Sequence, residues 1–214
     1  LAARWFTQEL HSYPARERHL QQGRAASLLP GSRMTGASSL QQLTTLLAER
    51  TSRNFSNELL ALRDALLERY GDAVDALLFY GSSLRSGNAL EGLVDLYVVV
   101  DNYWSAYGRF LPAVFNKLLP PNVYYLEVTV NGQRVRAKYA VITLQDLERG
   151  TSMRWFHSYL WGRFSQPWGL LDSRDAGTGQ RVLRALAQAM TTFLTRVLPV
   201  LPDRLDCTAI WQQG

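Results

Sequence analysis

Two short apolar segments that follow each other closely in the chain constrain the fold most. Residues 75–81 read DALLFYG and residues 93–101 read LVDLYVVVD. Both are bounded by glycine and serine, and the second is rich in β-branched and aromatic residues, which favours buried strands over helices. The connecting segment, SSLRSGNALEG, consists mostly of small and polar residues. The sequence therefore predicts two buried strands joined by a turn of small residues.

Helices are predicted before and after these strands. The segments are 56–70, 103–119, 151–165 and 179–198. Apolar residues keep a helical period in the first segment, and Gly71 is a typical stop for it. Pro120 ends the second segment and Pro167 the third, because proline cannot continue a helix.

A β-hairpin is predicted between the second and third helices. Residues 122–130 and 134–142 alternate between apolar and polar side chains on either side of Asn131-Gly132. This dipeptide between alternating segments is a strong hairpin signal. The order helix, strand, strand, helix, hairpin and further helices predicts an α+β fold with a mixed sheet.

Composition limits the classes of protein that remain. At 214 residues and 47% hydrophobic, the chain can bury one core, with or without a helical appendage. Its formal charge of +5 permits a phosphate-bearing partner, an anionic membrane surface or a merely solvated face. Cys207 is the single cysteine, which excludes an intrachain disulfide framework. No apolar segment approaches the roughly 20 residues of a membrane-spanning helix.

Residues 1–33 differ from the rest of the chain. They are rich in arginine, show no sustained period and precede Met34. We interpret them as an N-terminal extension, either a tag or a targeting segment. The predicted folded part begins at residue 34.

A site for chemistry is predicted where the two buried strands meet their connecting turn. Side chains alternate along a strand, so Asp95, Tyr97 and Asp101 project from one face. The turn Gly81-Ser82-Ser83 offers backbone N–H groups and hydroxyls that can hold phosphate oxygens, and strand carboxylates can hold Mg²⁺. This combination is typical of a nucleoside triphosphate site that supports phosphoryl transfer.

Simpler interpretations of the same residues remain open. Asp95 could be a strand-end acid paired with an arginine, and Asp101 could be a capping acid. The serines could only shape the turn. Lys138 could lie on a solvated outward face, and Arg163 could be a surface arginine.

The chain resembles the nucleotidyltransferases of the polymerase-β type, in which a Gly-Ser turn precedes an acid within an apolar strand. More narrowly, it resembles the Tam41/Mmp37 family of peripheral-membrane phosphatidate cytidylyltransferases. The resemblance rests on Tyr80-Gly81-Ser82, on Asp95 followed by a strand that closes in Val-Asp at Asp101, and on three later segments. These segments are NVYY at 122–125, KYAVI at 138–142 and YLWGRFSQPW at 159–168.

The resemblance implies a nucleotidyltransferase-like mixed sheet flanked by helices. It implies a nucleotidyltransferase domain at 34–148 and a C-terminal helical region at 149–214, which continues further in family members. It also implies an enzyme that transfers CMP from CTP to phosphatidate, releases diphosphate and forms CDP-diacylglycerol, a precursor of phospholipids such as cardiolipin. No nucleic acid is expected as a partner.

The resemblance also implies roles for individual residues. Asp95 is an expected Mg²⁺ ligand and Lys138 an expected catalytic residue. Asp101, six residues further along the same face, is the expected second Mg²⁺ ligand and catalytic acid, which requires the strand to curl or bulge there. The expected nucleotide-binding residues are Tyr80, Gly81, Ser82, Ser83, Arg85, Lys138 and Arg163. Tyr97 departs from the wider superfamily, which usually has a second acid at that position.

The implied location is peripheral, on the cytoplasmic side of a bacterial inner membrane or on the matrix side of the mitochondrial inner membrane. The apolar side of residues 179–198, flanked by arginines, could lie in the membrane interface or pack on the domain. Two other functions remain open: a nucleotidyltransferase for another acceptor, and an inert module that binds nucleotides or proteins.

Overall fold

A computed structural model of the chain describes residues 36–51, 55–81, 92–108 and 121–200. The chain divides into two units: residues 40–192, and residues 1–39 together with 193–214. The sheet lies in the first of these units. The predicted N-terminal extension, residues 1–33, lies outside the described residues.

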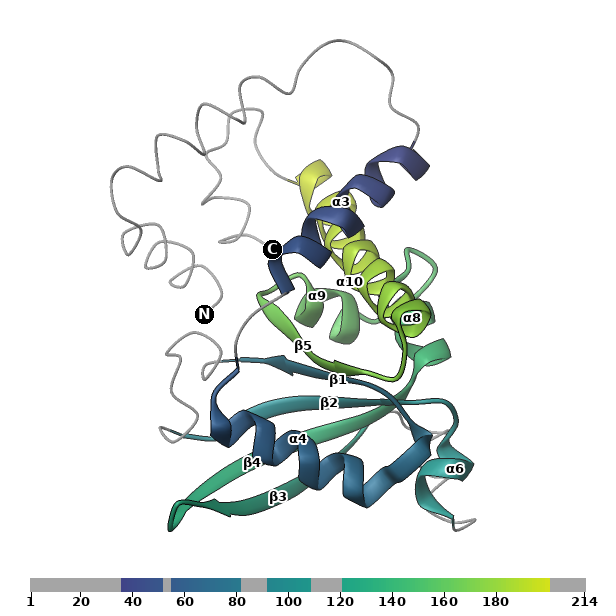
Figure 1. The fold of residues 1–214 in the computed structure, drawn as a ribbon. Helices are drawn as coiled ribbons and strands as arrows, with labels where there is room; N and C mark the ends of the chain where they lie inside the picture. Colours follow the sequence, from purple (N-terminus) through teal and green to yellow (C-terminus); the bar gives the residue numbers. More distant parts are fainter. Residues whose placement is uncertain (1–35, 52–54, 82–91, 109–120, 201–214) are drawn as a thin grey trace, which may run out of the picture. The chain divides into compact units, whose positions relative to one another are not determined.

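A five-stranded mixed sheet forms the centre of this unit (Figure 1). Its strands are β1 (Val74–Tyr80), β2 (Val94–Val100), β3 (Asn122–Val130), β4 (Gln133–Thr143) and β5 (Trp168–Ser173). The spatial order is β3-β4-β2-β1-β5. The pair β2 and β4 is parallel, and the other neighbouring pairs are antiparallel. The predicted α+β fold with a mixed sheet is therefore confirmed.

The local signals for the strands work as expected. Nearly every residue of β1 and β2 is buried, which explains why both segments are apolar without alternation. β3 and β4 pair from Asn122↔Val141 to Val130↔Gln133. Asn131 (φ 52°) and Gly132 (φ 77°) adopt the positive φ angles of a two-residue hairpin turn. The predicted hairpin is confirmed.

The helices are α3 (Gly36–Thr51), α4 (Asn57–Tyr70), α6 (Tyr103–Tyr107), α8 (Leu144–Thr151), α9 (Tyr159–Phe164) and α10 (Ala176–Val197). Two short 3₁₀ turns lie at Gly71–Ala73 (η1) and Leu198–Val200 (η2). Ser56 caps α4 by accepting from the backbone of Leu59, and Gly71 ends it with positive φ. The predicted first helix and the predicted C-terminal helix, α10, are thus confirmed.

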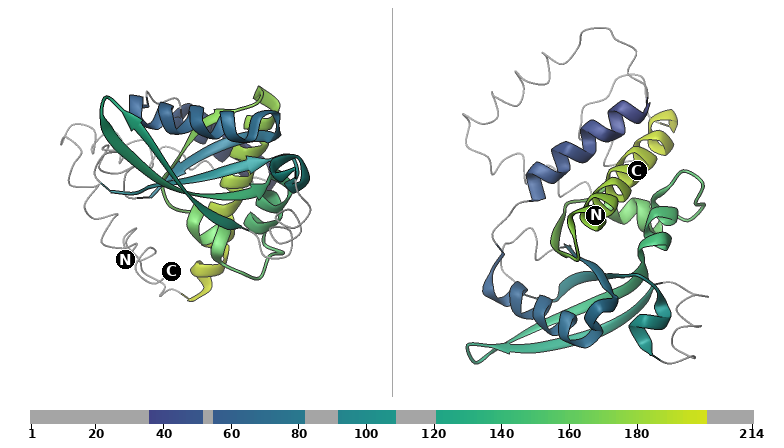
Figure 2. Two further views of the ribbon diagram at one scale, coloured as in Figure 1. Left: turned by 90° about the horizontal axis from the view of Figure 1, so that it is seen from below. Right: turned by 45° about the vertical axis from the view of Figure 1, so that its right-hand side comes forward.

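Helices cover both faces of the sheet (Figures 1 and 2). On one face, Leu62 and Leu66 of α4 join Leu96 and Val98 of β2 in a buried cluster. On the other face, side chains of α8, α9 and α10 form a second cluster with the sheet, which includes Tyr97. Because strand side chains alternate, Asp95 projects toward this second face together with Tyr97.

Several segments differ from the sequence predictions. The helix expected at 103–119 is described only as α6, and Gly108 ends it in a left-handed conformation; residues 109–120 lie outside the described residues. The helix expected at 151–165 is confined to α9, and α8 lies before it. The segment after Pro167 forms β5, which pairs with β1. The boundary expected at residue 149 therefore does not separate a purely helical region from the sheet.

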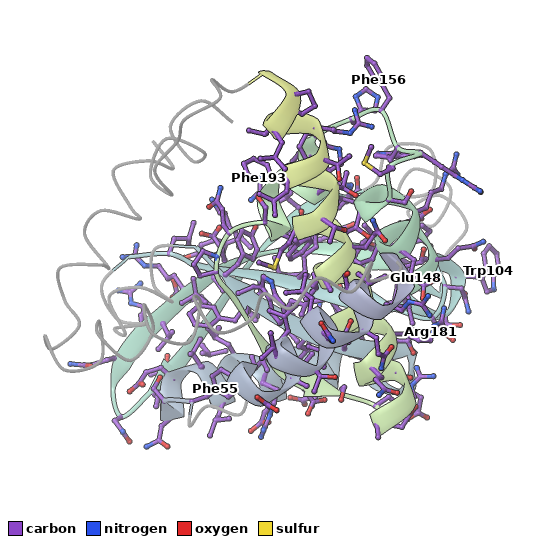
Figure 3. All side chains as sticks on the ribbon, turned by 90° about the horizontal axis from the view of Figure 1, so that it is seen from above. Phe55, Trp104, Glu148, Phe156, Arg181 and Phe193 are labelled. Atoms are coloured by element: carbon purple, nitrogen blue, oxygen red, sulfur yellow. The ribbon has the colours of Figure 1, made fainter. Side chains whose placement is uncertain are left out.

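A contact between helices fixes α8 against α10. Glu148 accepts two hydrogen bonds from the guanidinium of Arg181, at 2.9 and 3.0 Å, and Figure 3 labels both residues.

Over the described ranges, no helix combines the length and apolar character that a membrane crossing needs.

Candidate functional site

A row of side chains crosses the sheet at the end of β1. Tyr80 is the register partner of Asp95, and Asp95 is the register partner of Lys138. All three positions lie on the sheet face that carries α9, so strand pairing alone brings them together. Lys138 lies beside Asp95 because β4 runs parallel to β2, although the two residues are far apart in the sequence.

Gly81 follows β1 directly and lies against the carboxylate of Asp95. Its φ is +90°, a conformation that side-chain-bearing residues rarely adopt. A Cβ atom placed there would overlap Asp95 Oδ2 and lie 3.0 Å from Asp95 Cγ. Only glycine lets the backbone of the turn approach this carboxylate so closely.

Asp95 and Lys138 form an ion pair at the site. Lys138 Nζ lies 3.0 Å from Asp95 Oδ1. The Asp95 side chain is only 14% exposed, whereas that of Lys138 is 48% exposed. The contact lacks hydrogen-bond geometry, so the buried Oδ1 has no hydrogen-bond partner. We regard the pair as an electrostatic contact whose lysine can move aside into solvent.

Arg163 reaches the same end of the sheet from α9. Its Nη1 donates a hydrogen bond to the hydroxyl of Tyr80 at 3.0 Å. The guanidinium also lies over the rings of Tyr80 and Tyr159, 5.2 and 4.8 Å from their centroids. Burial raises the pKa of Tyr80 to about 12, although the charge of Arg163 acts in the opposite direction. Tyr80 therefore stays a neutral hydroxyl that orients the arginine.

Tyr159 was missed by the sequence interpretation as a partner of Arg163. It precedes Arg163 by four residues on α9, so the two side chains share one face of the helix. The spacing of four residues within a helix was the sequence signal from which this contact could have been predicted.

Tyr97 is part of the core. Its side chain is fully buried, and its ring centroid lies 5.3 Å from that of Tyr80 and 5.0 Å from that of Phe164. Burial raises its pKa far above the usual range for a phenol. The strand position two residues after Asp95 is therefore filled by an uncharged ring that packs against Tyr80 and Phe164.

Asp101 does not join Asp95, which corrects the prediction that both hold the same ion. β2 pairs with β4 in unbroken register from Val94 to Val100, so no bulge brings the two acids together. Six strand residues span roughly 20 Å. Asp101 lies beyond the opposite end of β2, where its Oδ1 accepts a hydrogen bond from the backbone of Asn102 at 2.6 Å.

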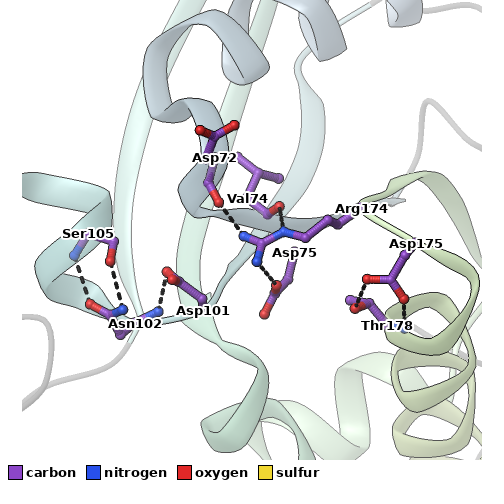
Figure 4. A network of polar contacts seen from close by, with 9 residues as sticks. All are labelled: Asp72, Val74, Asp75, Asp101, Asn102, Ser105, Arg174, Asp175 and Thr178. Carbon is purple, nitrogen blue, oxygen red and sulfur yellow. Dashed lines mark hydrogen bonds and ion pairs between the residues drawn. The ribbon is translucent and has the colours of Figure 1, made fainter.

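The region near Asp101 has a structural role that sequence reasoning missed (Figure 4). Arg174 donates hydrogen bonds to the carbonyl oxygens of Val74, at 3.2 Å, and of Asp72. Its Nη1 lies 3.4 Å from Asp75 Oδ1. Burial raises the pKa of Asp75, and the charge of Arg174 offsets part of this effect. These contacts join the end of β5 to the irregular start of β1.

Ser82, Ser83 and Arg85 lie outside the described residues. Of the two predicted Mg²⁺ ligands, only Asp95 is at this end of the sheet. Within the described ranges, no three acidic, histidine or cysteine side chains gather into a metal-binding group. One carboxylate with a poorly partnered oxygen still suits Mg²⁺, which commonly keeps its waters and binds one or two carboxylates together with substrate phosphates.

The aromatic residues around α9 and the apolar side of α10 have structural places. Phe164 and Trp168 are buried, whereas Phe156 is 85% exposed and His157 is exposed beside it in a loop. On α10, Val182, Leu186 and Ala189 pack in the second cluster. This part of α10 therefore packs on the domain, as the simpler interpretation of that helix had it.

Comparison with known proteins adds no further constraint. No protein-family model matches the chain, and no curated protein matches it significantly.

Proposed function

We propose that the chain is a CTP:phosphatidate cytidylyltransferase of the polymerase-β nucleotidyltransferase type, acting at a membrane surface. The observation that carries the proposal is the close approach of Gly81 to the Asp95 carboxylate, with Lys138 beside it. A glycine turn beside a strand carboxylate suits a triphosphate and its cation, because such a turn can offer backbone N–H groups to phosphate oxygens and the carboxylate can bind Mg²⁺. The sequence motifs around these residues favour the cytidylyltransferase family.

In the proposed reaction, an oxygen of the phosphatidate phosphate attacks the α-phosphorus of CTP. The new oxygen to phosphorus bond forms as the bond between the α-phosphorus and the bridging oxygen of the diphosphate breaks, and diphosphate leaves with that electron pair. The attacking phosphate is already an anion, so a strong general base is not needed. Alignment of the two phosphates and neutralisation of charge supply most of the rate increase.

Each residue of the candidate site would have its own role in this reaction. Gly81 allows backbone N–H groups to approach the triphosphate, and Asp95 provides a carboxylate for Mg²⁺. When bound, Mg²⁺ would neutralise charge on the triphosphate and on the leaving diphosphate. Lys138 would turn from Asp95 toward phosphate, and Arg163, positioned by Tyr80 and Tyr159, would supply a second positive charge.

A second candidate is a module that binds a nucleotide without transferring it. The observation in its favour is the ion pair between Asp95 and Lys138, since lysine neutralises the carboxylate that a metal would need. A nucleotidyltransferase for an acceptor other than phosphatidate would use the same residues.

The test measures diphosphate release by the purified chain with Mg²⁺, CTP and phosphatidate in detergent micelles. Parallel reactions contain ATP, GTP or UTP, or omit phosphatidate. We expect release only with CTP and phosphatidate together. Release without phosphatidate would identify another acceptor or simple hydrolysis, and CTP binding without release would favour the inert module.

A further inference from the structure

We propose that the open face of the β3–β4 hairpin is the surface that contacts the lipid bilayer and presents phosphatidate to Asp95. This inference rests on the proposed function. The hairpin face is defined by Val123, Tyr125, Glu127 and Thr129 of β3 with Arg134 and Arg136 of β4. All six side chains are exposed.

The hairpin face continues the row of the candidate site. Tyr125 is the register partner of Lys138, which is in turn the partner of Asp95. On the other side of Asp95, Tyr80 and Phe164 pack together and Arg163 lies over the ring of Tyr80. The surface beside Asp95 is therefore covered toward β1 and exposed toward β3.

The two faces of the hairpin differ in burial. Val135, Ala137 and Tyr139 are buried against the side of the sheet that carries α4. On the hairpin face, Val123 is 58% and Tyr125 is 56% exposed. These two side chains lie two positions apart on one face with charged residues beside them, and we infer that they form the apolar part of the membrane contact.

The chemistry of the face suits an anionic bilayer. Arg134, Arg136 and Lys138 bring three positive charges, against Glu127, which lies 3.7 Å from Arg134, and Asp95, which pairs with Lys138. Tyrosine is favoured at the boundary between headgroups and acyl chains. Apolar side chains mixed with arginines bind anionic lipid surfaces by burial and by charge together.

The acceptor explains why this surface must face lipid. Phosphatidate keeps its acyl chains in the bilayer, so its phosphate can meet Asp95 only if the surface around Asp95 lies at the headgroups. Arg134 and Arg136 lie on the strand of Lys138, four and two positions before it on the same face. They can hold lipid phosphates next to the reacting one.

The test compares three double variants for binding to phosphatidylcholine vesicles with and without phosphatidate, by co-sedimentation and without CTP. Val123→Thr/Tyr125→Thr removes the apolar part, and Arg134→Gln/Arg136→Gln removes the charge. The matched control is Phe156→Ser/Arg154→Gln, which changes an exposed aromatic residue and an exposed arginine in a loop outside this face. Threonine keeps the strand propensity, and urea unfolding midpoints check that each variant is folded.

We expect wild type and the loop control to sediment with phosphatidate vesicles. Each lost arginine should weaken binding about fivefold at low salt, and added salt should reduce this difference. The threonine variant should also bind more weakly, with less dependence on salt. Equal binding by wild type and both hairpin variants, or a selective loss in the loop control, would overturn the inference.

The failure of this inference is distinguishable from that of the proposed function. Diphosphate release is measured in parallel with phosphatidate in vesicles and with a short-chain, water-soluble phosphatidate. The hairpin variants should lose several-fold more activity on vesicles than on the soluble acceptor. If the hairpin variants bind vesicles more weakly but wild type releases no diphosphate, the hairpin face is supported as the lipid-binding surface and the proposed enzymatic activity is refuted. If the hairpin variants lose diphosphate release equally on vesicles and on the soluble acceptor, the role of the hairpin face is overturned and the proposed activity is not.

Discussion

Gly81 and Asp95 meet because the backbone at residue 81 turns with φ +90° and has no side chain to keep the carboxylate away. Gly92, after the connecting segment, has φ +114°, but a Cβ atom placed on it would meet no other atom within 4 Å. Both glycines have positive φ, but only Gly81 lies against another residue. Comparing a substitution at each of them therefore distinguishes the effect of backbone strain from that of a steric clash.

We expect Gly81→Ala to lower turnover about a hundredfold, because displacing a reacting group by about 1 Å has an effect of this size. Gly92→Ala should show the same strain, about 1–3 kcal/mol in the free energy of unfolding, with far less change in turnover. Diphosphate release and urea unfolding measure the two quantities. Equal activity of the two variants would show that the contact with Asp95 is irrelevant to function.

Asp95 and Asp101 form a second matched pair, because both are strand-associated aspartates of β2 with different surroundings. Asp95→Asn should lower turnover by at least about a hundredfold, since it removes the carboxylate that the cation needs. Asp101→Asn should leave turnover near that of wild type. Turnover of the two variants is measured as diphosphate release. A large loss with Asp101→Asn would restore the metal role that the geometry denies it.

Asp75 should make stability depend on pH. Burial raises its pKa above the unfolded value, so its stabilising contribution is complete below the unfolded pKa and is lost as pH rises through the folded pKa. The variant Asp75→Asn has no carboxyl group that could titrate at this position. We expect wild type to gain stability relative to Asp75→Asn as the solution is acidified, measured as the urea midpoint across the acidic range. The opposite slope would mean that Arg174 outweighs burial.

At the scale of elements, Arg174 extends the connection between β5 and β1 beyond the pairing of the two strands. The backbone N–H of Arg174 donates to the carbonyl of Asp75 at 2.9 Å, and its side chain reaches Asp72 and Val74. β5 is an edge strand of only six residues. Side-chain contacts of this kind stabilise an edge that has a single neighbouring strand.

Arg174→Met should lower the free energy of unfolding by about 2 kcal/mol, because it removes hydrogen bonds and leaves Asp75 buried without its cation. The double variant Asp75→Asn/Arg174→Met should recover about 1 kcal/mol of that loss. Arg154→Met, at an exposed arginine, should change it by less than about 0.5 kcal/mol. Urea unfolding of wild type, Asp75→Asn, Arg174→Met and the double variant measures the coupling, and strict additivity would contradict it.

At the scale of the whole molecule, ligand binding and stability are linked. If CTP and Mg²⁺ bind the folded protein, saturation at about a hundred times the Kd should add about 2.7 kcal/mol to the free energy of unfolding. We expect a higher thermal midpoint with CTP and Mg²⁺, no rise with chelator present, and no rise for Asp95→Asn. A rise that survives chelation would show nucleotide binding without the metal.

Much of the fold was predictable because its signals are local. Ser56 and Gly71 mark the ends of α4, and Asn131-Gly132 marks the hairpin turn. β5 and α8 were missed because both are short, and β5 gains its strand structure from pairing with β1 far away in the sequence. Propensity alone does not report such pairing.

The sequence by itself determined the turn glycine, the acid in the following strand, and the face on which Asp95 and Tyr97 project, because backbone conformation and side-chain alternation are local properties. The tertiary structure decided which residues surround Asp95. The parallel pairing of β2 and β4 brings Lys138 to it, and α9 brings Arg163 to Tyr80. It also keeps Asp101 apart from Asp95, since the unbroken pairing of β2 with β4 leaves no bulge that could bring the two acids together.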